Sequence, residues 1–275
     1  MVQSLARHKT LDQLLARYGH IVIDECHHVP AVMTERILRA APARYVTGLT
    51  ATPKRRDGHH PIITMQCGPV RHTLGHDPER HARRLEQRVV RRDTQFDPQT
   101  LPSDPHIQEV FTALAIDEAR TELIAGDALQ LAAQGRQPLV LTERREHLER
   151  LAAHLATGSL TLITLHSEMR PAEHRAAREQ LASSDVDGGQ RVVLAIGRYI
   201  GEGFDDPRLD SLILAMPIAW KGTVVQYAGR LNRSNPGKQD VLIYDYVDAE
   251  VPVLRRMFAK RLRTYRSLGY ELLQT

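Results

Sequence analysis

Cysteine is scarce in this chain, and long apolar runs are missing from it. Its 275 residues include two cysteines, Cys26 and Cys67, which are too few for a disulfide framework. We therefore expect the protein to lie in the reducing cytoplasm. No signal-peptide pattern and no apolar run of membrane-spanning length occurs, so we expect no membrane partner.

Lysine is also rare, since only five of the 37 basic residues are lysines and the others are arginines. The formal net charge is +4 and the sequence pI is about 9.2. A basic balance suits a nucleic-acid surface, and arginine favours bidentate contacts with phosphate. An excess of arginine is equally typical of a GC-rich genome, so charge alone does not identify a partner.

The pattern of a phosphate-binding loop, G-x-x-x-x-G-K-[ST], is missing from the sequence. It requires glycines before a lysine that is followed by Ser or Thr. Lys9 is followed by Thr10, but the residues before it, Leu5-Ala-Arg-His8, contain no glycine. The sequence therefore predicts no backbone cradle for nucleotide phosphates, and we expect this chain alone to be inactive as a nucleotide hydrolase.

Short β-branched runs alternate with helical patterns, which predicts an α/β fold with a parallel sheet. We expect strands at 21–24, 45–50, 139–142, 160–165, 192–196, 212–214 and 241–246. Between them we expect helices at 31–40, 107–133, 144–156 and 172–182, with a further helix at 251–268. The proline-rich, polar segment 76–104 is interpreted as a linker that holds one strand, between units at 1–75 and 105–275.

An acidic pair follows the first predicted strand, at Asp24 and Glu25. Ligand sites of α/β folds lie at the carboxyl ends of strands. One carboxylate there would suit nucleotide-bound Mg²⁺, and the second would suit activation of a water molecule. An ordinary polar strand end is the simpler interpretation of the pair alone. A zinc site at Cys26, His27 and His28 is less well supported, because ligands this close do not match zinc spacing.

Two arginines stand three residues apart in Gln226-Tyr-Ala-Gly-Arg230-Leu-Asn-Arg233. The helical pattern that begins at Thr223 carries them, so we expect Arg230 and Arg233 to lie on one helix face. Two guanidinium groups on one face would suit an oxyanion such as a phosphate.

The helix expected at 251–268 carries a run of basic residues opposite its apolar face. They are Arg255, Arg256, Lys260, Arg261, Arg263 and Arg266. Such a face either is simply solvated or follows a nucleic-acid backbone.

Four segments, in chain order, resemble motifs of the superfamily 2 helicases in the DEAD/DEAH-box group. Asp24-Glu-Cys-His27 is similar to motif II in its DECH form, and Leu49-Thr-Ala-Thr-Pro53 is similar to motif III. The segment 196–205 is similar to motif V, and the segment 226–233 is similar to motif VI, Q-x-x-G-R-x-x-R. Segments 139–148 and 165–169 resemble the motif IV region, so the likeness covers nearly the whole chain.

The resemblance implies a role for each matching residue. At the nucleotide it implies Asp24 for Mg²⁺ and Glu25 for water activation, with Arg230 and Arg233 as a clamp on the γ-phosphate. It implies that His27 senses the γ-phosphate and communicates with Gln226. It further implies Thr50 and Thr52 in coupling, Gly203 and Asp205 as nucleotide or strand contacts, and Thr142, His166 and Arg198 as nucleic-acid contacts. Ile196 departs from the family's frequent Thr and lacks a hydroxyl for phosphate.

As a whole, the resemblance implies RecA-like folds, with a partial first domain and one complete second domain. The implied activity is ATP- and Mg²⁺-dependent movement on nucleic acid, DNA rather than RNA. Because no phosphate-binding loop is present, we expect a truncated helicase, or the C-terminal subunit of a split helicase whose other half carries that loop. A non-catalytic nucleic-acid-binding remnant is the alternative.

Overall fold

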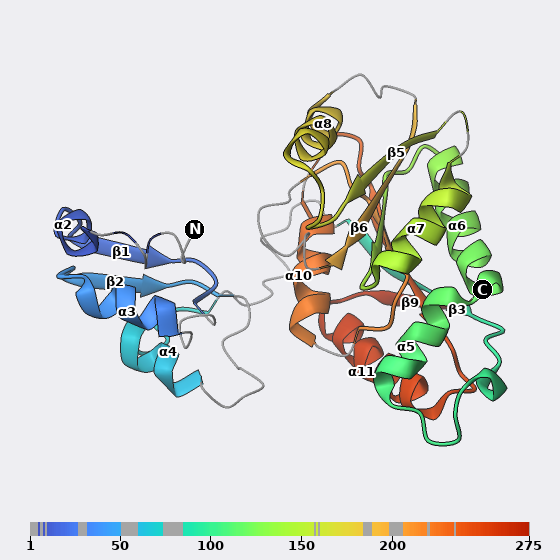
Figure 1. The fold of residues 1–275 in the computed structure, drawn as a ribbon, viewed down its shortest axis with the longest axis horizontal. Coiled ribbons are helices and arrows are strands. Elements are labelled where there is room, and N and C mark those ends of the chain that lie inside the picture. Colours follow the sequence, from blue (N-terminus) through green and yellow to red (C-terminus); the bar gives the residue numbers. More distant parts are fainter. Residues whose placement is uncertain are drawn as a thin grey trace. The chain divides into compact units, whose positions relative to one another are not determined.

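The chain divides into two compact units, Met1–Ala82 and Arg83–Thr275 (Figure 1). A computed structural model describes residues 5, 8, 10–26, 32–50, 60–73, 85–156, 158, 160–183, 189–197, 206–218, 221–233 and 235–274. Each unit has apolar clusters of its own. No helix in these ranges is long and apolar enough to cross a membrane.

The described residues of the smaller unit include a two-stranded parallel sheet and helices α2, α3 and α4. Strands β1 (His20–Ile23) and β2 (Tyr45–Gly48) pair from His20↔Tyr45 to Ile23↔Gly48. The helices are α2 (Leu11–Leu15), α3 (Val32–Ala40) and α4 (His60–Cys67). Leu11 and Leu15 of α2 pack against Ile37 of α3, which forms a small core of its own.

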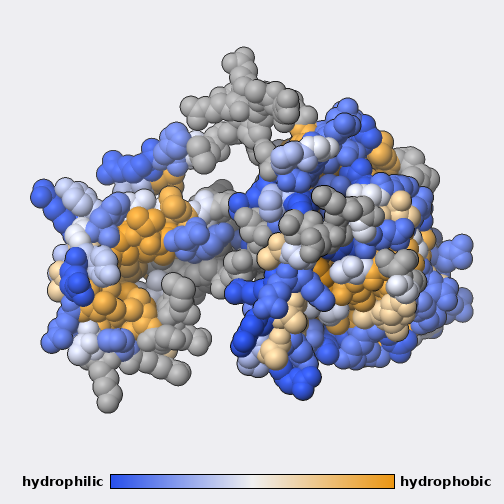
Figure 2. Space-filling view, turned by 90° about the horizontal axis from the view of Figure 1, so that it is seen from above, coloured by the Kyte–Doolittle hydropathy of each residue, from blue (hydrophilic) through white to orange (hydrophobic). Residues whose placement is uncertain are grey.

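One face of this small sheet is exposed. Alternate residues of each strand face opposite sides, and the side that carries Val22 and Tyr45 is open, with 58% and 57% of these residues accessible. Among the described residues, most of the large exposed apolar side chains belong to this unit, and Figure 2 shows apolar groups at its surface. An isolated two-stranded sheet is only marginally stable, so we expect the described part of the smaller unit to be held together only weakly.

The larger unit contains a seven-stranded parallel sheet in the order β5-β6-β4-β7-β8-β3-β9. The strands are β3 (Glu86–Asp93), β4 (Pro138–Thr142), β5 (Leu160–Leu165), β6 (Gln190–Ile196), β7 (Ser211–Leu214), β8 (Asp240–Val247) and β9 (Glu271–Gln274). The chain runs outward from β4 to β5, returns to β6, and then crosses β4 to reach β7. Such a reversal of strand order is where α/β folds place ligands, at the carboxyl ends of the strands.

Helices cover both faces of this sheet (Figure 1). The helices are α5 (Ile107–Ile116), α6 (Glu118–Ala133), α7 (Arg145–Leu155), α8 (Pro171–Ala182), α10 (Lys221–Leu231) and α11 (Pro252–Ser267). Side chains of α8, α10 and α11 share one apolar cluster with the sheet, and those of α6 and α7 share another. The predicted α/β class and parallel sheet are therefore confirmed.

Three sequence expectations need correction. The strand expected inside a linker is β3, which pairs with β8 and β9 and buries Val89 and Val90, so the larger unit begins well before residue 105. The helix expected at 107–133 is two helices, because Asp117 caps α6 by accepting a hydrogen bond from Arg120 N at 2.7 Å. The edge strand β9 was not expected.

Limited proteolysis should separate the two units. The larger unit has its own two-sided core, whereas the smaller has two strands and an open apolar face, so a resistant fragment should begin near residue 85. Mass spectrometry of the fragments gives the boundary. Equal resistance of the smaller unit to the protease, or a resistant fragment that begins near residue 105, would contradict the assignment of β3 to the core of the larger unit.

Candidate functional site

The acidic pair lies where β1 ends. Asp24 is exposed and Glu25 is half-buried, and the Glu25 backbone N–H donates to Asp24 Oδ1 at 2.9 Å. Glu25 has a φ of 50°, the only positive φ of a non-glycine residue in the described parts of the chain. Left-handed backbone costs free energy for such a residue and occurs often at functional sites. The turn thus places two neighbouring acidic residues at the carboxyl end of β1.

The segment after β2 lies beside this acidic turn. Leu49 N donates to Ile23 O at 2.8 Å, and Cys26 N donates to Leu49 O at 2.9 Å. These bonds continue the parallel pairing beyond both strands, so Thr50 follows Leu49 at the same sheet edge as Asp24 and Glu25. The structure thus joins the beginnings of the two predicted motifs. His27 and Thr52 lie outside the described residues.

Tight sulfur packing holds these two segments together. A Cβ built on Gly48 would lie 2.8 Å from Cys26 Sγ and 3.0 Å from Cys67 Sγ. Burial, together with the neighbouring Cys67, raises the pKa of Cys26 to about 11, and burial also raises the pKa of Cys67. The other two residues of the zinc hypothesis, His27 and His28, lie outside the described residues. Among the described residues no group of three His, Cys, Asp or Glu side chains is placed to hold a metal.

In the larger unit, three predicted motifs converge at the carboxyl edge of the sheet. Thr142, at the end of β4, is in register with Ile196, at the end of β6, so Glu143 and Gly197 leave the sheet side by side. A Cβ on Gly197 would lie 2.5 Å from Glu143 Oε1 and 2.5 Å from the Tyr227 hydroxyl of α10. Desolvation and the Glu143 carboxylate raise the pKa of Tyr227. A larger residue at this position would have to shift the ends of both side chains.

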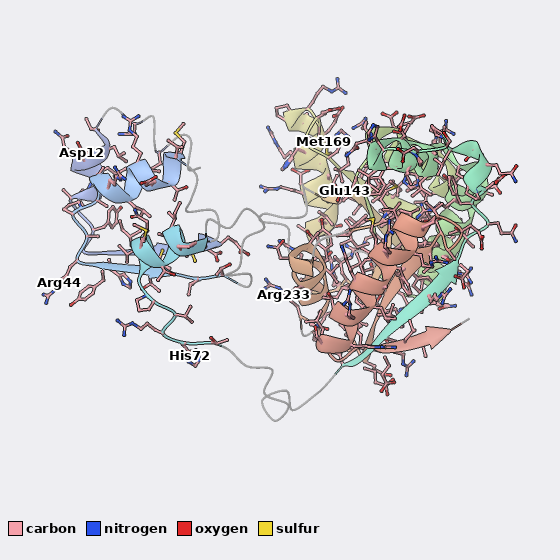
Figure 3. All side chains as sticks on the ribbon, turned by 90° about the horizontal axis from the view of Figure 1, so that it is seen from below. Asp12, Arg44, His72, Glu143, Met169 and Arg233 are labelled. Carbon is pink, nitrogen blue, oxygen red and sulfur yellow. The ribbon has the colours of Figure 1, made fainter. Side chains whose placement is uncertain are left out.

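Helix α10 presents part of the arginine motif opposite its buried face. Val224, Tyr227, Ala228 and Leu231 are buried at helical spacing, while Gln226 and Arg230 are half-buried. The helix ends at Leu231, so Arg233 lies beyond it and is exposed (Figure 3). The expectation that Arg230 and Arg233 share one helix face is therefore wrong, because the helix stops between them.

Lys238 fixes the segment that carries Arg233. Its ammonium group donates to the carbonyl oxygens of Leu231 and Leu209, and to Arg233 O at 3.3 Å. Cations near the last carbonyls of a helix stabilise its end. Desolvation lowers the pKa of Lys238 to about 8. Lys238 was not among the residues expected to matter. The sequence marks it only by the glycine before it, Gly237, which has a φ of 86° in the turn.

The predicted nucleic-acid contacts have different surroundings. Thr142 is 1% exposed, and its hydroxyl lies 3.1 Å from His147 Nδ1, so this burial argues against a direct backbone contact. His166 follows β5 at the same edge and is partly exposed. Arg198, Gly203 and Asp205 lie outside the described residues. The neighbouring Asp206 is described, and it is buried against Arg191 at 2.9 Å.

Comparisons with known proteins identify what this arrangement is similar to. Residues 1–55 match the family described as type III restriction enzyme, res subunit. A putative ATP-dependent RNA helicase of Acanthamoeba polyphaga mimivirus is 22% identical over 99% of this chain and 51% of its own length. The probable helicase D10 of Escherichia phage T5 is 25% identical over 98% of this chain and 57% of its own. The chain thus spans about half the length of these curated relatives.

Solved structures show the same fold. T4 UvsW matches with a TM-score of 0.55 at 17% identity, over 100% of this chain and 57% of that one. The ATP-dependent type ISP restriction-modification enzyme LlaBIII, bound to DNA, matches with a TM-score of 0.66 at 13% identity, over 100% of this chain and 23% of that one. The comparisons confirm the resemblance to superfamily 2 helicases, and the RecA-like α/β fold.

Replacing Gly197 with alanine should destabilise the larger unit. The added methyl group must displace the end of the exposed Glu143 side chain and the hydroxyl of the buried Tyr227. Because Tyr227 is buried, such overpacking should cost about 1–3 kcal/mol. The matched control is Gly229→Ala in α10, where a Cβ meets nothing within 4 Å and helix propensity should add about 1 kcal/mol of stability. Urea denaturation measures both. Equal stability of the two variants would contradict the close approach at Gly197.

The buried His147 should make folding sensitive to acid. Burial, with Arg120 and Arg150 nearby, lowers its pKa from 6.5 to about 3. Between pH 6.5 and 3 the unfolded chain binds the proton that the folded state refuses, so the free energy of unfolding should decrease as pH falls. His147→Gln lacks this contribution, and its denaturation midpoint should depend less on pH in this window. A variant with the wild-type pH dependence would show that His147 is not held neutral.

Proposed function

We propose that this chain is part of an ATP-dependent superfamily 2 DNA helicase or translocase. The convergence of Glu143, Gly197 and the α10 helix at one sheet edge supports this proposal most directly. It places segments that resemble motifs IV, V and VI together, and two relatives that span nearly the whole chain are named helicases.

In the proposed site, the smaller unit contributes carboxylates for Mg²⁺ and for water. Mg²⁺ prefers oxygen ligands and often binds through water, and the exposed Asp24 carboxylate at a strand end fits that preference. Bound to ATP, the ion neutralises charge on the phosphates. Glu25 would orient or deprotonate the attacking water from the same turn. Thr50, beside this turn, and Thr52 are proposed to couple these events to domain movement.

The larger unit would contribute cations and a sensor. Arg230 and Arg233 are proposed to clamp the γ-phosphate, with Lys238 holding the backbone from which Arg233 projects. Gln226 stands one turn before Arg230 and would communicate with His27. Because Arg233 lies beyond the helix, its reach depends on the turn rather than on helix geometry.

Nucleic-acid contacts are proposed at the same edge of the larger unit. His166 and Arg198 are retained as backbone contacts, and Gly203 and Asp205 as residues near nucleotide or strand. The burial of Thr142 makes it a support for His147 instead. Contacts to the backbone would give little sequence preference, and DNA is proposed rather than RNA.

A complete ATP site also requires a phosphate-binding loop, and we propose that residues outside this sequence provide it. Either another part of a longer protein or a separate subunit would supply the loop. A non-catalytic remnant that only binds nucleic acid is a second candidate, favoured by the missing loop pattern. The intact motif II and motif VI residues favour the catalytic proposal.

Arg233→Ala should abolish ATP turnover while DNA binding persists. The experiment uses the chain together with a polypeptide that supplies the phosphate-binding loop. Loss of an arginine finger lowers phosphoryl-transfer rates by roughly 10³–10⁵, whereas one guanidinium away from the strand should scarcely change DNA affinity at fixed salt. ATPase and DNA-binding titrations are measured on the same protein.

The matched control is Arg178→Ala, an exposed arginine of α8, which should change neither quantity. If Arg233→Ala weakened DNA binding and left turnover near wild type, Arg233 would be a strand contact. The assignment of motif VI would then be wrong.

A further inference from the structure

Helix α11 carries a continuous basic surface on its outer side. Its inner side packs into the larger unit through Leu254, Met257, Phe258, Arg261, Thr264 and Tyr265. Five exposed cations occupy the opposite arc, and we call them the α11 stripe. They are Arg255, Arg256, Lys260, Arg263 and Arg266.

A buried ion pair fixes which side of α11 faces outward. Arg261 is 3% exposed and binds the Asp245 carboxylate of β8 through two hydrogen bonds of 2.7 Å. A third bond, from Arg261 Nη1 to Ile218 O, measures 3.1 Å, and the Tyr265 hydroxyl donates to Asp245 Oδ2 at 2.8 Å. The expectation that Arg261 belongs to the basic surface is therefore wrong. Its burial sets the rotation of the helix and leaves the five other cations outside.

Local acids do not compensate the α11 stripe. Helix α7 pairs its half-buried arginines with its own carboxylates, Arg145 with Glu149 at 2.7 Å and Arg150 with Glu146 at 3.3 Å. Helix α11 contains no Asp or Glu. Within the described parts of the chain, none of the five stripe residues forms an ion pair.

Five like charges on one face repel one another, and the packing of α11 against the larger unit uses other residues of the helix. From Arg255 to Arg266 the stripe extends about 16 Å, at roughly 1.5 Å of rise per residue. Arginine binds phosphate oxygens through two parallel hydrogen bonds. The aromatic residues of α11, Phe258 and Tyr265, are buried. The surface therefore offers phosphate contacts without base stacking.

We propose that the α11 stripe binds the sugar-phosphate backbone of nucleic acid, independently of base sequence. This inference rests on the proposed function, since it takes the same partner, but it adds a binding surface outside the helicase-like motifs. It predicts a salt-dependent contribution to affinity, because each neutralised phosphate releases counterions.

The test measures binding of the full chain to a fluorescent oligo-dT strand between 50 and 200 mM salt, roughly the range over which such contacts weaken strongly. The double variant Arg263→Gln/Arg266→Gln is compared with Arg175→Gln/Arg178→Gln, which removes two exposed charges from α8. Each lost phosphate contact lowers the slope of log K against log salt by about 0.7 for a single strand. The α11 variant should therefore lose about 1.4 of slope, and the α8 control should keep the wild-type slope.

Two results with the variants would overturn the proposal that the α11 stripe binds nucleic acid. Equal loss of slope in both variants would show a general effect of charge, and unchanged binding of the α11 variant would show that the stripe does not contribute. Wild-type protein that binds no DNA at 50 mM salt would overturn the stripe and count against the proposed function. Binding to anionic lipid vesicles without binding to DNA would assign the stripe to a membrane surface. Unchanged thermal midpoints in the variants show that folding is intact.

Discussion

The buried ion pair between Asp245 and Arg261 is the interaction on which the placement of α10 and α11 in the larger unit depends. It joins β8 to α11, and through Ile218 it also holds the segment that leads into α10. Removing one partner would leave an uncompensated buried charge, which typically costs about 3–5 kcal/mol. The position of the arginine motif and the outward direction of the α11 stripe therefore share one electrostatic anchor. A second pair, Arg120 with Asp248, joins α6 to the end of β8 at 3.0 Å.

Parallel strands explain why residues far apart in the sequence meet. Every pairing in both sheets is parallel, so the loops that follow the strands emerge at one edge of each sheet. At each edge a glycine permits the close approach, Gly48 beside two sulfurs and Gly197 beside Glu143 and Tyr227. The proposed function divides the chemistry between the units, with carboxylates on the smaller and guanidinium groups on the larger.

Much of this arrangement was predictable, because β-branched runs such as 192–196 specify buried parallel strands and the motif residues follow them. The misses have physical causes. The sequence of β3 looks polar because it is rich in arginine. The sheet accommodates these arginines because they bind carboxylates, as Arg92 binds Asp127 at 2.9 Å. The burial of Arg261 depends on Asp245, which lies on another element and gives no local signal. Lys238 likewise depends on carbonyl groups from two segments, at Leu209 and at 231–233, that only the fold brings together.

The central claim is that this chain carries the acidic and arginine parts of a helicase ATP site and requires a phosphate-binding loop from elsewhere. ATP turnover in the presence of single-stranded DNA tests it most directly, measured for the chain alone and with a polypeptide that supplies the loop. The account predicts turnover only in the mixture. Turnover by the chain alone in the range of roughly 1–100 per second, typical of phosphoryl-transfer enzymes, would contradict it.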